Sequence, residues 1–193
     1  MRKILSKLLI IGGLLIISSV AYMNYNTNKI NENMVNEYKK NMQDNIQYSE
    51  VRQDEYNIGD VIGVLNIPKI DLEVAIKRGI DKEVLKDAVG HFENSAMPGE
   101  YGNFAVAGHR AYTNNKFFSN LDELEIGDEL NVLTQGKTHT YKVNHIEVVE
   151  PEQVEVVESI NQEIKEITLV TCTPKYIGSH RLIVKGIYIE KSN

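Results

Sequence analysis

The sequence predicts a mainly β domain, either a closed barrel or a sandwich, behind one apolar segment at the N-terminus. From Ile58 onward, short β-branched runs are separated by Gly, Pro and Asn, as in a chain of many short strands. Helical patterns between these runs are few and short, whereas a parallel α/β sheet would alternate strands with long helices. The apolar segment is predicted from residues 8–23, which contain no charged side chain.

The N-terminal segment has the composition of a signal anchor. Counting from Ile4, with Lys7 extending its amine to the interface, gives the roughly 20 residues that span a bilayer. Because this run exceeds the apolar region of a usual signal peptide, we favour an uncleaved anchor. Cleavage after Ser19-Val20-Ala21 is the alternative. The basic residues Arg2 and Lys3 before the span place the N-terminus inside the cell and the rest of the chain outside.

Four segments are therefore expected along the chain: a cytoplasmic N-terminus (1–7), a transmembrane signal anchor (8–23), an extracellular stalk (24–57) and a β domain (58–193). The stalk is rich in Asn and charge, and Met34, Tyr38 and Met42 predict a helix between Glu32 and Gln47 by their spacing. Such a stalk would lift the domain away from the membrane. The predicted location is the cell membrane, crossed once, with the β domain extracellular.

The elements of the β domain follow from its apolar runs and turn residues. The hairpin signal is Gln135-Gly136-Lys137, where Gly supplies a positive φ. Helical spacing predicts one short helix over 81–89 and one or two helical turns over 117–124. The predicted strands are 61–67, 72–76, 103–109, 128–134, 138–149, 164–172 and 181–190.

Composition excludes several classes of function. The formal net charge is −6 and there is no basic cluster, so nucleic acid is not expected as a partner. The sequence has no Cys or His pairs at zinc-ligand spacing, and it lacks the G-x-S-x-G motif of serine hydrolases. The 193 residues leave room for one ordinary globular domain and the segments that precede it.

The single cysteine, Cys172, ends the apolar run of "TLVTCTP". Outside the cell, structural cysteines usually occur in disulfide pairs, and this one has no partner within the chain. Three interpretations stay open from the residue alone: a buried structural thiol, half of an intermolecular disulfide, or a nucleophile. A nucleophilic cysteine reacts as the thiolate and needs a base or a cation nearby.

The five histidines and the arginines supply the candidates for such a base or cation. His109 follows an apolar strand and a glycine, which would present its imidazole at a strand end. Arg181 begins the strand after the Cys172 strand, and antiparallel pairing of these two strands would place it across from Cys172. His91, His139 and His145 are expected to be surface or structural residues.

These residues together resemble the sortases, membrane-anchored cysteine transpeptidases of Gram-positive bacteria. The resemblance covers roughly residues 58 to 190 and the order of anchor and stalk before them. It rests on "TLVTC", on the downstream strand arginine and on the Gly108-His109 pair. The resemblance implies a closed eight-stranded β-barrel with one or two short helices. It also implies that Cys172 is the nucleophile, His109 the general acid and base, and Arg181 the substrate and oxyanion partner.

The subclass that the chain resembles is class A or D. Residues 24 to 60 contain no proline, so the Asp-Pro-aromatic lid of class C is missing, and the chain stops at Asn193 without a second span. The long inserted helix of class B has little room between the strands. The acidic loop 150–166 lies where such enzymes cover the substrate pocket; Ca²⁺ binding there is open, but a solvated loop and no cofactor are expected.

The function implied is cleavage of an LPxTG-like sorting signal between Thr and Gly. A thioester on Cys172 would then pass the secreted protein to an amine of a peptidoglycan precursor. Two alternatives stay open: a thiol hydrolase of the same family that makes no transfer, and a non-enzymatic membrane-tethered β domain whose Cys172 is buried or dimerises.

Overall fold

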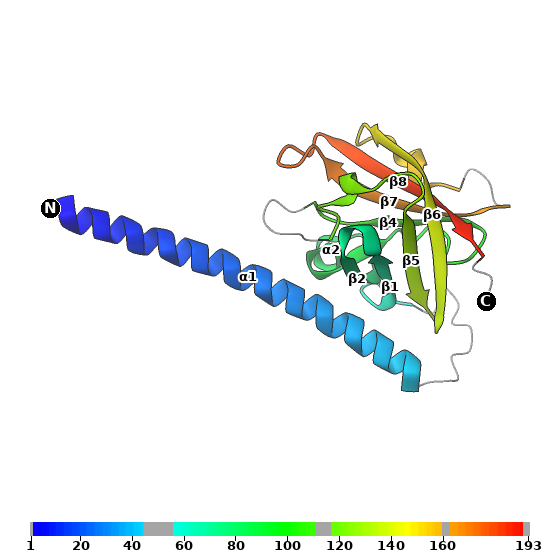
Figure 1. Cartoon of the computed structure of the whole chain (residues 1–193), viewed down its shortest axis with the longest axis horizontal. Helices are drawn as coiled ribbons and strands as arrows, with labels where there is room; N and C mark the ends of the chain where they lie inside the picture. Colours follow the sequence, from blue (N-terminus) through cyan, green and yellow to red (C-terminus); the bar gives the residue numbers. More distant parts are fainter. Residues whose placement is uncertain (1, 45–55, 111–116, 160–162, 191–193) are drawn as a thin grey trace.

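Eight strands close into a barrel in the computed structural model, which describes residues 2–44, 56–110, 117–159 and 163–190. The order around the barrel is β1-β2-β3-β4-β7-β8-β6-β5, and β1 pairs with β5 to close it (Figure 1). Neighbours are antiparallel except β2 with β3 and β4 with β7, which are parallel. The predicted closed eight-stranded barrel is confirmed. The strands are β1 (Val61–Ile67), β2 (Leu72–Arg78), β3 (Val89–His91), β4 (Gly102–Ala107), β5 (Glu129–Thr134), β6 (Lys137–Val149), β7 (Lys165–Thr173) and β8 (His180–Ile189).

Short helices fill the connections between strands. The predicted short helix is α2 (Lys82–Asp87), and the Asp81 carboxylate caps it by accepting hydrogen bonds from the backbone N–H groups of Glu83 and Val84. The predicted turn near residue 120 is a single 3₁₀ turn. The 3₁₀ turns are η2 (Pro68–Ile70), η3 (Leu121–Glu123) and η4 (Val154–Val157).

The β5–β6 hairpin forms as the sequence predicts. Gln135 and Gly136 have φ angles of 47° and 74°, so both central residues are left-handed, as in the two-residue turn that matches strand twist. Thr134 and Lys137 pair across the turn, and the register then continues to Glu129 and Lys142.

The barrel interior is filled by large aliphatic and aromatic side chains that lie on the inward face of each strand. Phe118 is fully buried and packs directly beneath Gly108, where an added Cβ would lie 2.6 Å from the ring. A glycine is therefore required immediately before His109, because any side chain there would displace Phe118 from the core. This contact couples the core to the chain segment that holds His109.

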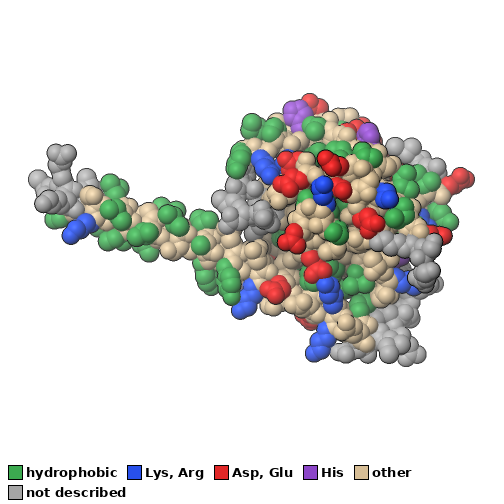
Figure 2. All heavy atoms as spheres, viewed as in Figure 1, with side chains coloured by type: hydrophobic (Ala, Val, Ile, Leu, Met, Phe, Trp, Pro, Cys, Tyr) green, Lys and Arg blue, Asp and Glu red, His purple; other side chains and the backbone are tan. Residues whose placement is uncertain are grey.

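The N-terminal helix is longer than the sequence predicts. A single helix, α1 (Arg2–Asp44), includes both the apolar segment and the described part of the predicted stalk, and it begins far before Glu32. An 18-residue window of α1 has a mean hydropathy of 1.8 and none of it is buried in the protein, so the helix is long and apolar enough to cross a membrane. Figure 2 shows hydrophobic side chains along its N-terminal half. Residues 45–55 lie outside the described residues.

The C-terminal half of α1 packs on the outside of the barrel, so this part of the predicted stalk is docked against the β domain. The separation of the domain from the membrane stays a prediction. Val35 and Tyr38 are buried against Val64, Ala75 and Ala88. The pairing of β3 with β2 begins only at Ile76, so Ala75 has a free edge for α1 to cover.

Polar contacts fix the position of α1 along the barrel. The Asn31 amide donates to the Glu73 carbonyl at 3.1 Å, and its oxygen accepts from the Ala75 N–H at 3.0 Å. The Asn31 side chain thus occupies backbone groups of the open edge of β2, which would otherwise be available to another chain. At the other end, the Tyr38 hydroxyl donates to the Ile62 carbonyl at 2.9 Å.

A chain that begins at Asn24 should be soluble and monomeric, since it lacks the apolar span and keeps the docked part of α1. In that chain, Val35→Asp should release the helix, because the substitution puts a charge into a buried apolar contact. Trypsin should then cut at Lys39 and Lys40 several-fold faster. Val35→Ala should cause a smaller increase. Equal cleavage rates in all three chains would show that the docking contributes nothing.

Candidate functional site

Cys172 and Arg181 lie directly opposite each other on neighbouring antiparallel strands. The β7–β8 register pairs Cys172 with Arg181 and Thr173 with His180. Directly opposed residues on one sheet face have their Cβ atoms about 5 Å apart. Cys172 is half-buried and forms no disulfide, so its thiol is free within reach of the Arg181 side chain. The antiparallel pairing that the sequence predicts is confirmed.

His109 approaches Cys172 from the other side. The parallel β4–β7 register pairs Ala107 with Val170. Beyond the strand, the Gly108 N–H donates to the Val170 carbonyl at 3.0 Å and the Thr171 hydroxyl donates to the Gly108 carbonyl at 2.7 Å. Continuing this register by two residues sets His109 across from Cys172, about one strand spacing away. His109 is exposed, and this continued register puts the three residues in a row across the segment that follows β4, β7 and β8.

The Arg181 guanidinium is oriented by the loop between β7 and β8. Its Nη1 donates to the carbonyls of Gly178, at 3.2 Å, and His180, at 3.0 Å. Gly178 has a φ of 68°, and a Cβ added there would lie 3.6 Å from the Cβ of Cys172. The loop therefore folds back toward Cys172 and holds the guanidinium at the thiol end of the strand pair.

Arg110 is a site residue to which sequence reasoning assigned no role. Its side chain is only 4% exposed, and its Nη2 lies 2.7 Å from the Asp122 carboxylate. Its Nη1 donates to the Thr173 hydroxyl at 2.9 Å and to the Cys172 carbonyl at 3.4 Å. Arg110 thereby ties the segment after His109 to the end of β7, which fixes the separation of His109 and Cys172. The one sequence signal for Arg110 is its position next to His109. Neighbouring residues in an extended chain point to opposite sides, so Arg110 faces inward where His109 faces outward.

His180 does not join the row. Its Nε2 lies 3.2 Å from the Glu150 carboxylate, and its Nδ1 lies 2.8 Å from the Ser179 hydroxyl. Alternation along β8 turns His180 away from the face that holds Arg181. The imidazole is thus engaged with the loop that follows β6 and not with Cys172.

The other three histidines lie apart from Cys172. His145 is exposed near Glu147, and His139 is half-buried, with its pKa lowered by burial and by Lys165 and Lys137. His91 is fully buried, and its Nε2 lies 3.0 Å from the Ala96 carbonyl. Burial lowers the pKa of His91 to about 4, so the imidazole is neutral at pH 7. His91 is therefore structural and not a surface residue.

The depressed pKa of His91 predicts a loss of stability in acid. The unfolded chain takes up a proton near pH 6.5, whereas the folded chain does so only near pH 4, so stability falls as the pH drops through this interval. At pH 4.5 the loss from this group should be about 2 to 3 kcal/mol. His91→Gln keeps a donor toward Ala96 and should lose less between pH 7 and pH 4.5 in urea unfolding. The same pH dependence in both proteins would contradict the assignment.

A hollow of about 300 Å³ lies between the segment that follows β3 and the segment that contains η4. Its apolar walls come from Ile80, Phe92, Val154 and Val157. One wall of the hollow is formed by η4 and the residue that follows it. The Asn103 side chain holds this wall in place by donating hydrogen bonds to the carbonyls of Val156 and Glu158. The rest of the lining is Glu93, Asn94, Ser95 and Glu158.

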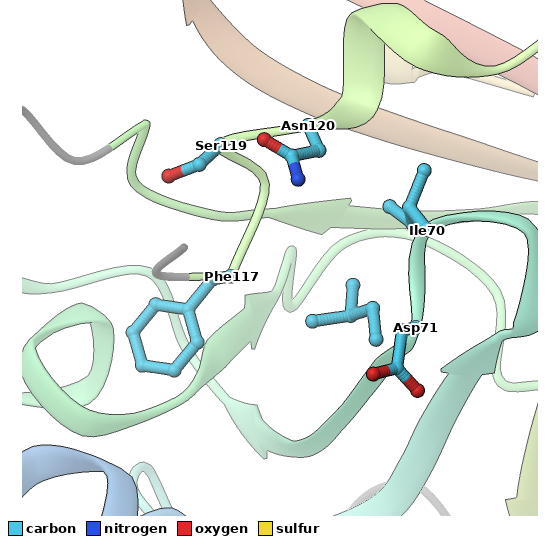
Figure 3. Close-up of a pocket in the computed structure, with 6 residues that line it drawn as sticks. Ile70, Asp71, Phe117, Ser119 and Asn120 are labelled. Carbon is cyan, nitrogen blue, oxygen red and sulfur yellow. The ribbon is translucent and has the colours of Figure 1, made fainter. Parts of the chain in front are cut away.

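A second hollow lies between the β1–β2 turn and the segment before η3 (Figure 3). Its volume is about 70 Å³, enough for a few waters and too small for a peptide side chain with its backbone. Ile70, Asp71 and Leu72 line one side, and Phe117, Ser119 and Asn120 line the other. It contains none of the residues of the row.

Metal ligands are not assembled in the part of the chain that the structure describes. Over residues 2–44, 56–110, 117–159 and 163–190, no three His, Cys, Asp or Glu side chains are grouped so as to hold an ion. The expectation of no cofactor, with Ca²⁺ binding by the loop 150–166 left open, stays a prediction, because residues 160–162 lie outside the described residues.

Comparison with known proteins places the chain among relatives with this barrel. A family model described as the Sortase domain matches residues 65–188. Sortase SrtE1 of Streptomyces coelicolor is 32% identical over 203 residues, which cover 98% of this chain and 57% of that protein. Sortase D of Bacillus subtilis is 29% identical over 201 residues, which cover 96% of this chain and 98% of that one.

A solved structure has the same fold. The Sortase D5 transpeptidase of Clostridium perfringens is 37% identical, with a TM-score of 0.72 over 84% of this chain and 99% of that one. The matched region includes His109, Cys172 and Arg181. The resemblance seen in the sequence is thus confirmed, and the chain belongs to the sortase family.

Proposed function

We propose that this sortase is a cysteine transpeptidase that cleaves an LPxTG-like sorting signal between Thr and Gly. The observation that supports it best is the row of His109, Cys172 and Arg181 across the segment after β4 and the strands β7 and β8. A nucleophile flanked by a proton carrier and a cation is the arrangement that acyl transfer needs. The reaction consists of two steps, and each passes through a tetrahedral intermediate at the same carbonyl carbon.

In the first step the Cys172 thiolate attacks the Thr carbonyl carbon and the C–N bond to Gly breaks. The protonated imidazole of His109 gives its proton to the departing nitrogen, so the amine leaves neutral. In the second step an incoming amine attacks the thioester and His109 takes a proton from it. The new amide forms, and Cys172 leaves as the thiolate.

Arg181 stabilises the negative charge that develops on the carbonyl oxygen in both steps. Its guanidinium is held in advance by the carbonyls of Gly178 and His180, so it need not reorganise when the charge appears. Arg110 acts differently, since it is buried and paired with Asp122 and holds the chain on both sides of the thiol.

The sorting peptide extends from Cys172 over Ala107 of β4 and Val170 of β7, the partly exposed residues on the outer face beside it. The small side chain of Ala107 leaves room there for a peptide backbone. The apolar hollow between the segment after β3 and η4 has the volume and lining for the Leu and Pro side chains of the signal. η4 forms one wall of this hollow.

The proposed setting is the outer face of the cell membrane. The apolar part of α1 is the anchor, Arg2, Lys3 and Lys7 hold its start inside, and the barrel lies outside. The substrates are secreted proteins that end in a sorting signal, and the acceptor is an amine of a cell-wall precursor.

Arg181→Lys should lose far more activity than its conserved charge suggests. A guanidinium presents paired, fixed donors to an oxygen, whereas an ammonium is a point charge on a flexible stem. We expect kcat/KM to fall on the order of a hundredfold, close to the cost of one oxyanion donor. Lys185→Arg on the same strand is the matched control and should stay near wild type. An Arg181→Lys variant within a few-fold of wild type would contradict the assigned role.

The experiment for the proposed function is incubation with a small library of LPxTG-like peptides, with and without triglycine, followed by mass spectrometry. Transpeptidation predicts a product joined at Thr to triglycine. Cleavage with only a free Thr carboxylate would favour the thiol hydrolase. No cleavage of any peptide would favour a non-enzymatic β domain, and native Cys172 would then resist rapid alkylation.

A further inference from the structure

The docked part of α1 gives the helix a definite direction along the barrel. Tyr38 contacts Ile62 and the N–H of Gln135, in the β5–β6 turn, at one end of the barrel. Asn31, two turns earlier in the helix, contacts Glu73 and Ala75 toward the other end of β2. Followed toward its N-terminus, α1 therefore runs away from the β5–β6 turn.

The row of His109, Cys172 and Arg181 lies at the end toward which α1 runs. β6 begins beside the β5–β6 turn at Lys137 and ends at Val149, which pairs with Arg181. Twelve residues of strand correspond to about 40 Å, so the turn and Cys172 lie at opposite ends of the barrel. Figure 1 shows the β7–β8 hairpin on the side toward which the N-terminal half of α1 projects.

The apolar span is continuous with the docked segment. α1 has no break between Met23, the last residue of the predicted span, and Asn31. Eight helical residues span about 12 Å, so the span begins close to the level of the catalytic end. Because α1 is docked on the barrel at Asn31, Val35 and Tyr38, the orientation of the span also sets the orientation of the barrel.

The loop at this end presents two large apolar side chains to solvent. Tyr176 and Ile177, at the tip between β7 and β8, are 70% and 72% exposed. Figure 2 shows hydrophobic side chains at the edge of the barrel where Figure 1 places this hairpin. An aromatic ring with a hydroxyl beside an aliphatic side chain suits the boundary between headgroups and acyl chains.

We propose that the Tyr176-Ile177 tip rests on the lipid interface of the membrane that α1 spans, so that Cys172 works at the membrane surface. The inference depends on the proposed membrane span. The tip contacts the bilayer, because the apolar half of the docked helix leaves the barrel on the same side as the tip. The loop that positions Arg181 is then also the membrane contact.

Single tryptophans test the contact directly, because the natural chain contains none. The full chain would be reconstituted into phosphatidylglycerol vesicles with lipids brominated on the upper acyl chain, which quench tryptophan on contact. The probes are Ile177→Trp at the tip, Tyr22→Trp in the span, and Tyr101→Trp. Tyr101 is 67% exposed and precedes β4 at the end away from Cys172.

Quenching of Ile177→Trp comparable to that of Tyr22→Trp, with Tyr101→Trp unaffected, is the expected result. Quenching of Tyr22→Trp without Ile177→Trp would overturn the membrane contact while leaving the anchor in place. Quenching of neither would overturn the span itself and the contact with it. Equal quenching of Ile177→Trp and Tyr101→Trp would also overturn the proposal, since the barrel would then have no preferred orientation.

Discussion

Cys172→Ala should abolish both cleavage and transfer of a sorting peptide. No other side chain of the chain is a thiol, so the variant has no group that can form the thioester. The fold should persist, because Cys172 is half-buried and the substitution removes a single sulfur atom at the rim of the barrel. The measurement is product formation by liquid chromatography with peptide and triglycine, with circular dichroism and thermal unfolding as the check on folding.

Two matched variants sharpen this test. Thr173→Ser changes the next residue and keeps the hydroxyl that Arg110 contacts, so it should stay near wild type. Cys172→Ser places a weaker nucleophile at the same position and should leave little or no activity. Residual cleavage by a folded Cys172→Ala protein at more than a trace of the wild-type rate would rule out a cysteine mechanism.

The second large effect should separate two histidines that both precede an arginine. His109→Ala should be nearly inactive, whereas His180→Ala should keep most of its activity. His109 follows β4, and continuing the β4–β7 register sets it across from Cys172, where an imidazole can reach the leaving amine. The imidazole of His180 is engaged by Glu150 and Ser179, on the opposite side of β8 from Arg181.

The pH profile of kcat/KM checks this assignment independently. His180→Ala should preserve the wild-type profile, because the general acid is untouched. His109→Ala should lose the limb that reports the imidazole as well as the rate. A weakly active His109→Ala protein beside an inactive, folded His180→Ala protein would overturn both the assignment and the strand geometry on which it rests.

Most strands could be predicted because each one is a β-branched run bounded by turn residues. The β5–β6 hairpin is the clearest case, since Gln135-Gly136 supplies both left-handed residues of its turn. β3 was missed because it has only three residues, Val89–His91, too few to show an alternating pattern. It forms because β2 and β4 supply partners on both sides, and this is tertiary information.

The course of α1 could be predicted only in part. Met34, Tyr38 and Met42 indicated an apolar stripe, but the surface that receives it is formed by residues far along the chain. Nothing in the sequence indicated the role of Asn31, because asparagines are common in polar segments. Its role depends on the open edge of β2, which only the structure places beside it. The C-terminal half of α1 is therefore docked on the barrel, whereas the sequence predicts a free stalk.

The site was predictable where two residues are close in sequence and not where they are distant. Cys172 and Arg181 belong to successive strands, so hairpin pairing alone sets them opposite each other. Arg110 acquires its role from Asp122 in η3 and from the end of β7, contacts that no local pattern shows. Its burial beside the exposed His109 appears only once β4 and β7 are known to be parallel neighbours.

The central claim is that Cys172 becomes acylated by the part of the peptide that ends in Thr. The most direct measurement is intact-protein mass spectrometry after rapid acid quenching, with an LPxTG-like peptide and no amine acceptor. The account predicts a mass increase equal to the peptide up to Thr, located on Cys172 by proteolytic mapping and discharged when triglycine is added before the quench. Cleaved peptide without any adduct on wild-type protein, or an adduct that also forms on Cys172→Ala, would contradict the account.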